Sequence, residues 1–171
     1  EAAAHLAKQF FNHTVERKYT ALVWGDVIED SGTIEAHIAR HKQNRKTFDA
    51  YPEGDIGKHA ITHYTVLERF NYVTLISCVL ETGRTHQIRI HAQHLGNPIV
   101  ADDIYGDGEK LLLSSIKKKK FKLSKAEEEE RPLLARQALH AHTLRFELNG
   151  TNYQFEAPLP KDLTATLKQL D

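Results

Sequence analysis

The chain has 171 residues, of which 40% are hydrophobic, and this is enough to bury the core of one domain. Its 23 lysines and arginines balance 23 aspartates and glutamates, which excludes general polyanion binding through net charge but not a local basic cleft. The single cysteine, Cys78, excludes an internal disulfide framework and is expected to be a buried small hydrophobe in a reducing compartment.

The sequence carries no sign of a membrane or secretory segment. No apolar run approaches the roughly 20 residues of a membrane-spanning helix, and no signal-peptide pattern is present. We therefore expect a cytoplasmic protein with no membrane partner.

The chain starts at Glu1 and contains no methionine, so we also expect it to be a piece of a longer polypeptide.

The first part of the chain predicts a helix, two strands and a loop. Residues 2–11 predict a short helix, with apolar residues one turn apart. Residues 15–25 alternate apolar or aromatic with polar side chains, which predicts a half-buried strand. Residues 32–38 predict a shorter strand. The polar stretch 40–58, which holds several lysines and arginines, predicts an exposed basic loop.

The middle of the chain predicts a strand pair followed by a polar helix. Residues 61–70 and 72–80 are rich in β-branched and aromatic side chains and predict antiparallel strands. A helix is expected over about 84–95, ended by Gly96 and Pro98.

The last part predicts an insertion, a hairpin and a closing helix. Residues 107–136 are expected to be a surface insertion, with a solvated basic block at 117–120 and a solvated acidic block at 127–130. Strands 139–148 and 151–156 flank Asn-Gly, which favours a type I′ turn. A helix over 163–170 follows. Together these elements predict an α+β fold with a mixed, mostly antiparallel sheet and flanking helices.

A dense polar cluster follows the apolar run 73–80. Five of the eight residues from 84 to 91 are arginine, histidine or glutamine: Arg84, His86, Gln87, Arg89 and His91. On a helix, Arg89 lies about 140° round from Arg84, so the two arginines are not expected to serve one small target. We expect Arg89 to point inward to a buried carboxylate and Arg84 outward to a backbone phosphate. A buried guanidinium needs an acidic partner, and the sequence offers no evident one.

These residues belong to a longer pattern. Residues 82–91 read Thr-Gly-Arg-Thr-His-Gln-Ile-Arg-Ile-His and are followed by Gly96-x-Pro98-Ile99-Val100-x-Asp102-x-x-Tyr105-Gly106. This pattern closely resembles the signature of the RluA-type RNA pseudouridine synthases. Residues 17–25 resemble the second motif of that family, and Leu139-His140-Ala141 and Ala157-Pro158 match as well. The resemblance covers nearly the whole chain.

The resemblance implies an isomerisation that needs no cofactor and no metal. A uridine in structured RNA is flipped out of its stack, its glycosidic bond is broken, and the base is rejoined through C5. The implied partner is RNA. Ribosomal RNA, and in particular that of the large subunit, is a commoner substrate in the family than transfer RNA.

The resemblance also implies roles for individual residues. Tyr19 stacks on the flipped base and offers its hydroxyl, and Arg89 pairs with the catalytic aspartate and holds it ionised. Asp102 and Tyr105 are expected to be turn and packing residues. The expected substrate-binding residues, which contact phosphate or wall the pocket, are Arg84, His86, Gln87, His91 and Leu139.

The chain departs from the family pattern at one point. The catalytic aspartate of the family lies in a His-Arg-Leu-Asp motif followed by Thr-Ser-Gly, and nothing here matches it. No aspartate in residues 1–60 stands in a similar context. We therefore expect residues 1–171 to be a partial catalytic domain that lacks its amino-terminal part and is inactive alone, although the parent protein is a pseudouridine synthase.

Two other functions stay open. A non-catalytic RNA-binding module would keep the fold and the arginine and tyrosine surface, and would bind RNA in a salt-sensitive way without turnover. The eleven histidines suggest a metal-dependent hydrolase, with His37 and His41, and His91 and His94, at short spacings. However, no His-Glu-x-x-His motif or cysteine pair accompanies them.

Overall fold

A computed structural model describes residues 1–52, 56–116 and 130–171. The helices are α1 (Ala2–Phe11), α2 (Gln87–Leu95), α3 (Leu113–Ile116) and α4 (Lys161–Leu170). The strands are β1 (Glu16–Trp24), β2 (Ser31–Glu35), β3 (His37–Arg40), β4 (Phe48–Tyr51), β5 (Ile61–Arg69), β6 (Val73–Leu80), β7 (Leu139–Leu148) and β8 (Thr151–Glu156).

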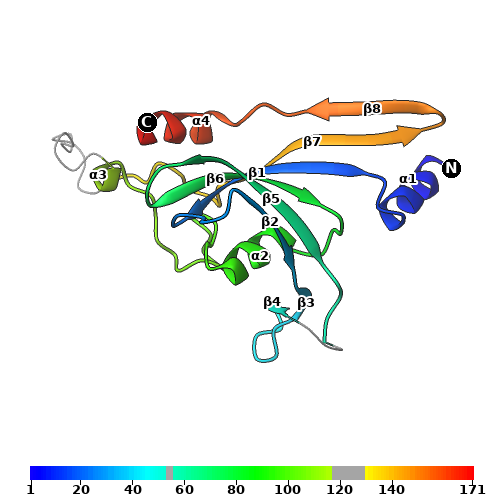
Figure 1. Cartoon of the computed structure of the whole chain (residues 1–171), viewed down its shortest axis with the longest axis horizontal. Helices are drawn as coiled ribbons and strands as arrows, with labels where there is room; N and C mark the ends of the chain where they lie inside the picture. Colours follow the sequence, from blue (N-terminus) through cyan, green and yellow to red (C-terminus); the bar gives the residue numbers. More distant parts are fainter. Residues whose placement is uncertain (53–55, 117–129) are drawn as a thin grey trace.

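One six-stranded sheet, in the order β2-β5-β6-β1-β7-β8, organises the fold. Each neighbouring pair in it is antiparallel, and β3 and β4 form a separate antiparallel pair. Figure 1 shows α2 beneath the bent sheet, α4 on the other side, and the β3–β4 pair projecting beyond α2. The expected α+β fold with a mostly antiparallel sheet is confirmed.

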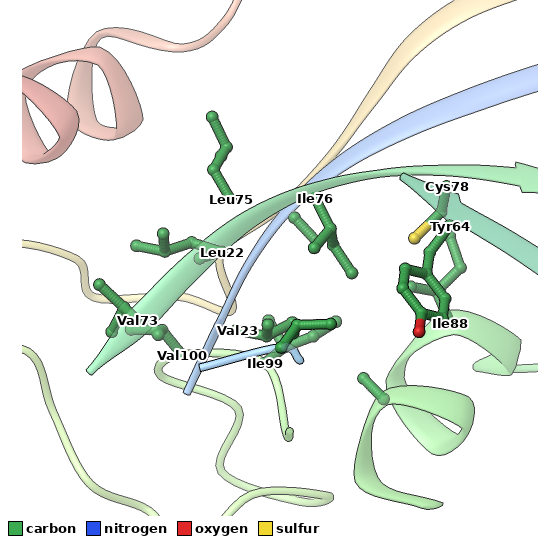
Figure 2. Close-up of a cluster of buried hydrophobic side chains, with 14 of the residues drawn as sticks. Leu22, Val23, Tyr64, Val73, Leu75, Ile76, Cys78, Ile88, Ile99 and Val100 are labelled. Carbon is green, nitrogen blue, oxygen red and sulfur yellow. The ribbon is translucent and has the colours of Figure 1, made fainter. Parts of the chain in front are cut away.

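The central strands are buried because their sequences are apolar on both faces. β6 is a nearly continuous apolar run, and most of its residues are buried, as expected for a strand covered on both sides. In Figure 2, Leu75 points toward the α4 side, whereas Cys78 lies with Tyr64 and Ile88 on the α2 side. Cys78 is buried as expected, and burial raises the pKa of its thiol to about 12.

The hairpin of β7 and β8 forms as the sequence predicts. Asn149 and Gly150 both have positive φ, at 53° and 77°, which is the backbone signature of a type I′ turn. Helix α1 lies near this turn (Figure 1), where the backbone N–H of Glu147 donates to the side-chain oxygen of Gln9 at 3.0 Å. The hairpin thereby extends the sheet past the site described below.

Two predictions in the first half of the chain are wrong. The single strand expected over 32–38 is divided at Ala36, which is fully buried and donates its N–H to the carbonyl of Ala60 at 3.2 Å. The basic loop expected over 40–58 contains β4, which pairs with β3. Its cations are compatible with a strand because Arg40 lies over the ring of Phe48, with 5.3 Å between the guanidinium carbon and the ring centroid.

The expected surface insertion over 107–136 is also only partly on the surface. Leu111 and Leu134 are almost fully buried, and the N–H of Leu133 donates to the carbonyl of Leu111 at 2.9 Å. The two ends of the insertion therefore belong to the core, where Leu111 and Leu134 are packed with the other buried side chains. The basic block 117–120 and most of the acidic block lie outside the described residues.

Within the described ranges, no helix is long and apolar enough to cross a membrane.

Candidate functional site

A cavity of about 380 Å³ opens where the start of α2 meets β1 and β7. This volume lies within the roughly 300–1,000 Å³ usual for small-ligand sites. No aspartate or glutamate is among the described residues that line it, so its electrostatic character is cationic. The residues of its wall that carry the argument below are Arg17, Tyr19, Arg84, His86, Arg89 and Leu139.

Arg89 is buried in this wall and has an acidic partner. Its Nε and Nη2 donate to the two carboxylate oxygens of Asp102 at 2.8 and 2.9 Å. The expectation that Arg89 points inward to a buried carboxylate is confirmed, but the statement that the sequence offers no partner is wrong. The partner, Asp102, lies in the same motif, thirteen residues later. It could have been found in the sequence, because a buried arginine needs a carboxylate.

The pair is electrostatically coupled. Burial by itself raises the pKa of the Asp102 carboxyl, but the hydrogen bonds from Arg89 and from two backbone N–H groups outweigh it, and the pKa lies below its usual value. The hydrogen bond with Asp102 also raises the pKa of Arg89, against the opposing effect of burial. Both groups are therefore charged at neutral pH.

The exit from α2 explains how Asp102 reaches Arg89. Val100 donates its N–H to the carbonyl of Leu22 in β1 at 3.0 Å, which fastens the chain to the sheet. Ala101 then takes a φ of 59°, a left-handed conformation that is strained for a residue with a side chain. This turn directs Asp102 back toward α2. A Cβ on Gly106 would lie 2.5 Å from the carbonyl oxygen of Asp102, so the last residue of the motif must be glycine.

Tyr105 connects this pair to the rim of the cavity. The Arg89 guanidinium lies 4.9 Å from the centre of its ring, and the N–H of Phe48 donates to its hydroxyl at 3.2 Å. The hydroxyl lies 2.9 Å from Nδ1 of His86. Because the hydroxyl accepts from Phe48, its own proton is available to Nδ1, and this arrangement leaves the ring proton of His86 on Nε2. Burial, followed by the charge of Arg89, lowers the pKa of His86, so a neutral ring is favoured.

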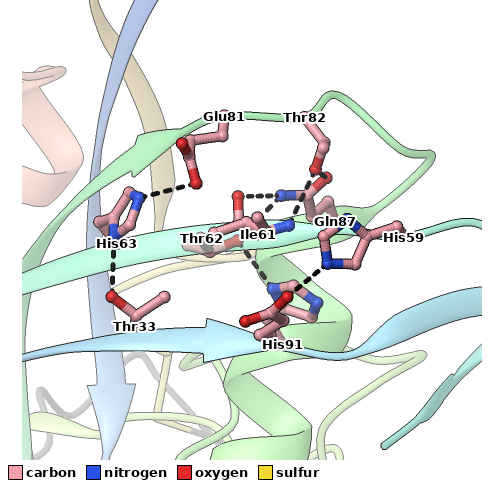
Figure 3. A network of polar contacts seen from close by, with 10 residues as sticks. Thr33, His59, Ile61, Thr62, His63, Glu81, Thr82, Gln87 and His91 are labelled. Carbon is pink, nitrogen blue, oxygen red and sulfur yellow. Dashed lines mark hydrogen bonds and ion pairs between the residues drawn. The ribbon is translucent and has the colours of Figure 1, made fainter. Parts of the chain in front are cut away.

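Gln87 lies in the cavity wall, but its amide is fully used inside the protein. Its Nε2 donates to the carbonyl of Ile61 and to the hydroxyl of Thr62, both at 3.0 Å. Its Oε1 accepts from the hydroxyl of Thr82 at 2.7 Å (Figure 3) and from the N–H of Arg84 at 3.0 Å. These bonds fasten the loop before α2 to β5 and leave the amide no free donor, so a substrate contact of Gln87 stays a prediction.

His91 is likewise a core residue, and its predicted substrate contact is wrong. Its ring is fully buried, with Nδ1 2.8 Å from the hydroxyl of Thr62 (Figure 3) and Nε2 3.1 Å from the carbonyl of Ala36. Nε2 therefore donates and Nδ1 accepts. The helical offset from Gln87 was right, but that face of α2 meets β5 and the β2–β3 junction, not solvent.

The burial of His91 predicts a stability loss at acid pH. Burial is the main cause of its lowered pKa, so the folded chain binds this proton less readily than the unfolded chain. Its stabilising contribution is therefore complete above about pH 6.5, the ordinary value for histidine, and falls as pH decreases. Urea unfolding at pH 7 and pH 5 is expected to show this fall, and His91→Gln is expected to reduce it. Equal pH dependence in both proteins would contradict the prediction.

The two arginines of the motif, Arg84 and Arg89, line one cavity, contrary to the expectation that they serve different targets. α2 begins at Gln87, not near Arg84, because His86 has a φ of 55° and cannot continue a right-handed helix. The helical angle between Arg84 and Arg89 therefore does not apply. The Nε of Arg84 donates to the carbonyl of His59 at 2.9 Å, which holds the side chain at the rim.

Tyr19 and Leu139 lie in the same wall, in the adjacent strands β1 and β7, where the sequence analysis expected a base-stacking ring and an apolar surface. Their roles stay predictions. Arg17 was missed. The signal for it was its position two residues before Tyr19, because alternate residues of a strand share a face.

The described histidines give no geometric support to the alternative of a metal-dependent hydrolase. Among residues 1–52, 56–116 and 130–171, no three histidine, cysteine, aspartate or glutamate side chains converge in a way that would hold a metal ion. His37 lies in β3 and the ring of His91 is occupied in the core.

Comparison with known proteins agrees with the motifs. Residues 1–94 match the family model described as RNA pseudouridylate synthase. An uncharacterized RNA pseudouridine synthase of Chlorobaculum parvum is 45% identical over 168 residues, which are 96% of this chain and 50% of the relative. The ribosomal large subunit pseudouridine synthase D of Xanthomonas campestris is 38% identical over 172 residues, 99% of this chain and 48% of the relative.

The fold agrees as well. The solved structure of human RNA pseudouridylate synthase domain containing 4 superposes with a TM-score of 0.72, over 98% of this chain and 67% of that one, at 23% identity. The chain spans about half the length of the curated relatives described above.

Proposed function

We propose, because this chain belongs to the RluA-type family of RNA pseudouridine synthases, that its full-length protein isomerises uridine to pseudouridine in structured RNA. The observation that carries the proposal is the cavity itself. It combines a tyrosine and a leucine, which suit a flipped base, with arginines that suit phosphate and no lining carboxylate among the described residues.

No carboxylate of the described residues lines this cavity, so we take the catalytic carboxylate to come from another part of the protein. Asp102 does not fill the role, because both of its oxygens are bound by Arg89 and it is fully buried. Asp102 uses Nε and Nη2 of Arg89, so Nη1 is the atom that we assign to a catalytic aspartate supplied outside these 171 residues. The chain alone is therefore expected to be inactive.

The proposed substrate is large-subunit ribosomal RNA, and the proposed compartment is the cytoplasm. The support for this substrate is the similarity to relatives named ribosomal large subunit pseudouridine synthase D. No cofactor is needed in this proposal, since the N1–C1′ bond is broken, a C5–C1′ bond is formed, C5 releases its proton and N1 gains one, with no change of oxidation state.

Tritium release from ribosomal RNA labelled at C5 of uridine tests the proposal. The full-length protein is expected to release tritium, and this chain alone is not. Turnover by the chain alone would contradict the missing carboxylate. Salt-sensitive RNA binding without turnover by the full-length protein would instead favour a non-catalytic RNA-binding module.

A further inference from the structure

Arg17 opens the second motif, beside Tyr19, but neither the resemblance nor the pair of Arg89 with Asp102 gives it a role. It lies in β1, with its guanidinium carbon 5.3 Å from the centre of the Phe10 ring of α1. Its Nε is buried and has no hydrogen-bond partner among the described residues. A buried donor without an acceptor is costly. Arg17 forms no ion pair with a described residue, so the part of its guanidinium that lines the cavity is suited to a ligand that carries an acceptor.

Gly83 is shaped to this side chain. A Cβ at residue 83 would overlap Nη1 of Arg17, and the φ of Gly83 lies outside the left-handed region. A Cβ here would therefore displace the end of the flexible Arg17 side chain, whereas the backbone conformation itself does not demand glycine. The loop before α2 and the ring of Phe10 together hold the guanidinium in place at the edge of the cavity.

The surroundings of Arg17 favour an anion. Arg84 and Arg89 line the same cavity, and the latter is already neutralised by Asp102. Arg17 also lines a second cavity of about 230 Å³, which Lys18 and Arg145 line as well. Glu16 lies 3.8 Å from Arg145 and offsets its charge. The charges of Arg17 and Lys18 remain, so the surface that joins the two cavities is net positive.

We propose that Arg17 binds a phosphate of the RNA backbone next to the nucleotide held in the cavity. This inference rests on the proposed function and adds a phosphate-binding residue to it. The forked guanidinium suits a phosphate, and Tyr19, two residues later on the same strand face, places the base one nucleotide-length from that contact. Phe10 and Gly83 preset its position, which reduces the entropy lost on binding.

Fluorescence anisotropy of the full-length protein with a labelled stem-loop RNA, carrying an unpaired uridine in its loop, tests the inference. Arg17→Gln is expected to weaken binding about tenfold, the loss of one charge-assisted contact. It is also expected to reduce the slope of log affinity against log salt by about one. Arg17→Lys is expected to keep the slope with a smaller loss. Lys168→Gln, on the exposed face of α4, is the charge-matched control and should change neither.

Gly83→Ala provides an independent variant that removes no charge. It is expected to weaken binding by displacing Arg17, and the double variant is expected to be no weaker than Arg17→Gln alone. Additive losses would contradict the shared mechanism. Unchanged affinity and slope for Arg17→Gln, in a protein that still releases tritium, would overturn this inference and leave the proposed function intact. Weaker binding with an unchanged slope would also overturn it, since the partner would then not be a phosphate. Absence of RNA binding by the unmodified protein would overturn both.

Discussion

Asp102→Asn is expected to lower the free energy of unfolding by about 3–5 kcal/mol, the usual cost of removing one partner from a buried ion pair. The Asp102 side chain is fully buried and that of Arg89 is 9% exposed, so water cannot replace the lost carboxylate. Asparagine keeps an oxygen for the backbone N–H groups of Ile104 and Tyr105 but presents an amide donor to the guanidinium. Urea unfolding followed by Trp24 fluorescence measures the loss.

Asp103→Asn is the matched control, because the neighbouring aspartate is exposed and is expected to change stability by less than about 0.5 kcal/mol. The pH dependence gives a second check. Asp102 has a lowered pKa in the folded chain, so its contribution is complete above the unfolded value of about 3.9 and is lost as pH falls through the folded value. The difference between the unmodified chain and Asp102→Asn should therefore shrink in acid. A loss below about 1 kcal/mol at pH 7 would show that the pair is not essential.

Tyr19→Ala in the full-length protein is expected to lower kcat/KM for uridine isomerisation about 5- to 150-fold. This range is the rate equivalent of about 1–3 kcal/mol, the cost of removing one aromatic ring that stacks on a base. Tyr19 is half-buried at the cavity wall, so its ring is both held by the sheet and accessible to a ligand. Tritium release at limiting RNA concentration measures the effect.

Two further variants separate the contributions of the ring. Tyr19→Phe keeps the stacking surface, so its activity shows what the hydroxyl adds. Tyr72→Ala removes an exposed aromatic ring at the β5–β6 turn, which is not part of the cavity, and is expected to leave kcat/KM unchanged. Equal activity of Tyr19→Ala and the unmodified protein would remove Tyr19 from the site.

The sequence predicted the regular elements where local chemistry decides them. The Asn149-Gly150 turn and the strand pair of β5 and β6 were predictable because positive-φ residues and apolar alternation act over short distances. The β3–β4 pair was missed because its polar sequence forms strands only when Ile38 packs with Phe48 beside Tyr105. Ile38 and Tyr105 are 67 positions apart in the chain, so their packing leaves no local periodicity.

The site divides in the same way. The motif located Tyr19, Arg84, Arg89 and Leu139, and the structure brings all four to one cavity. The motif alone could not distinguish the polar residues that face the cavity from those that hold α2 and the loop before it against β5. His91 belongs to the second group, since its hydrogen bonds close only when β5 and the β2–β3 junction meet α2.

The order of residues along this chain determined its family, its strand-rich architecture and the group of side chains from which the site is built. Only the tertiary structure decided which of them are available to a ligand, because burial and hydrogen-bond partners depend on segments far apart in sequence. The strained turn at Ala101 places Asp102 against Arg89. Contacts with Phe10 and Gly83 position the side chain of Arg17. A buried charge or donor must find its complement in space, and neighbours in space are not fixed by neighbours in sequence.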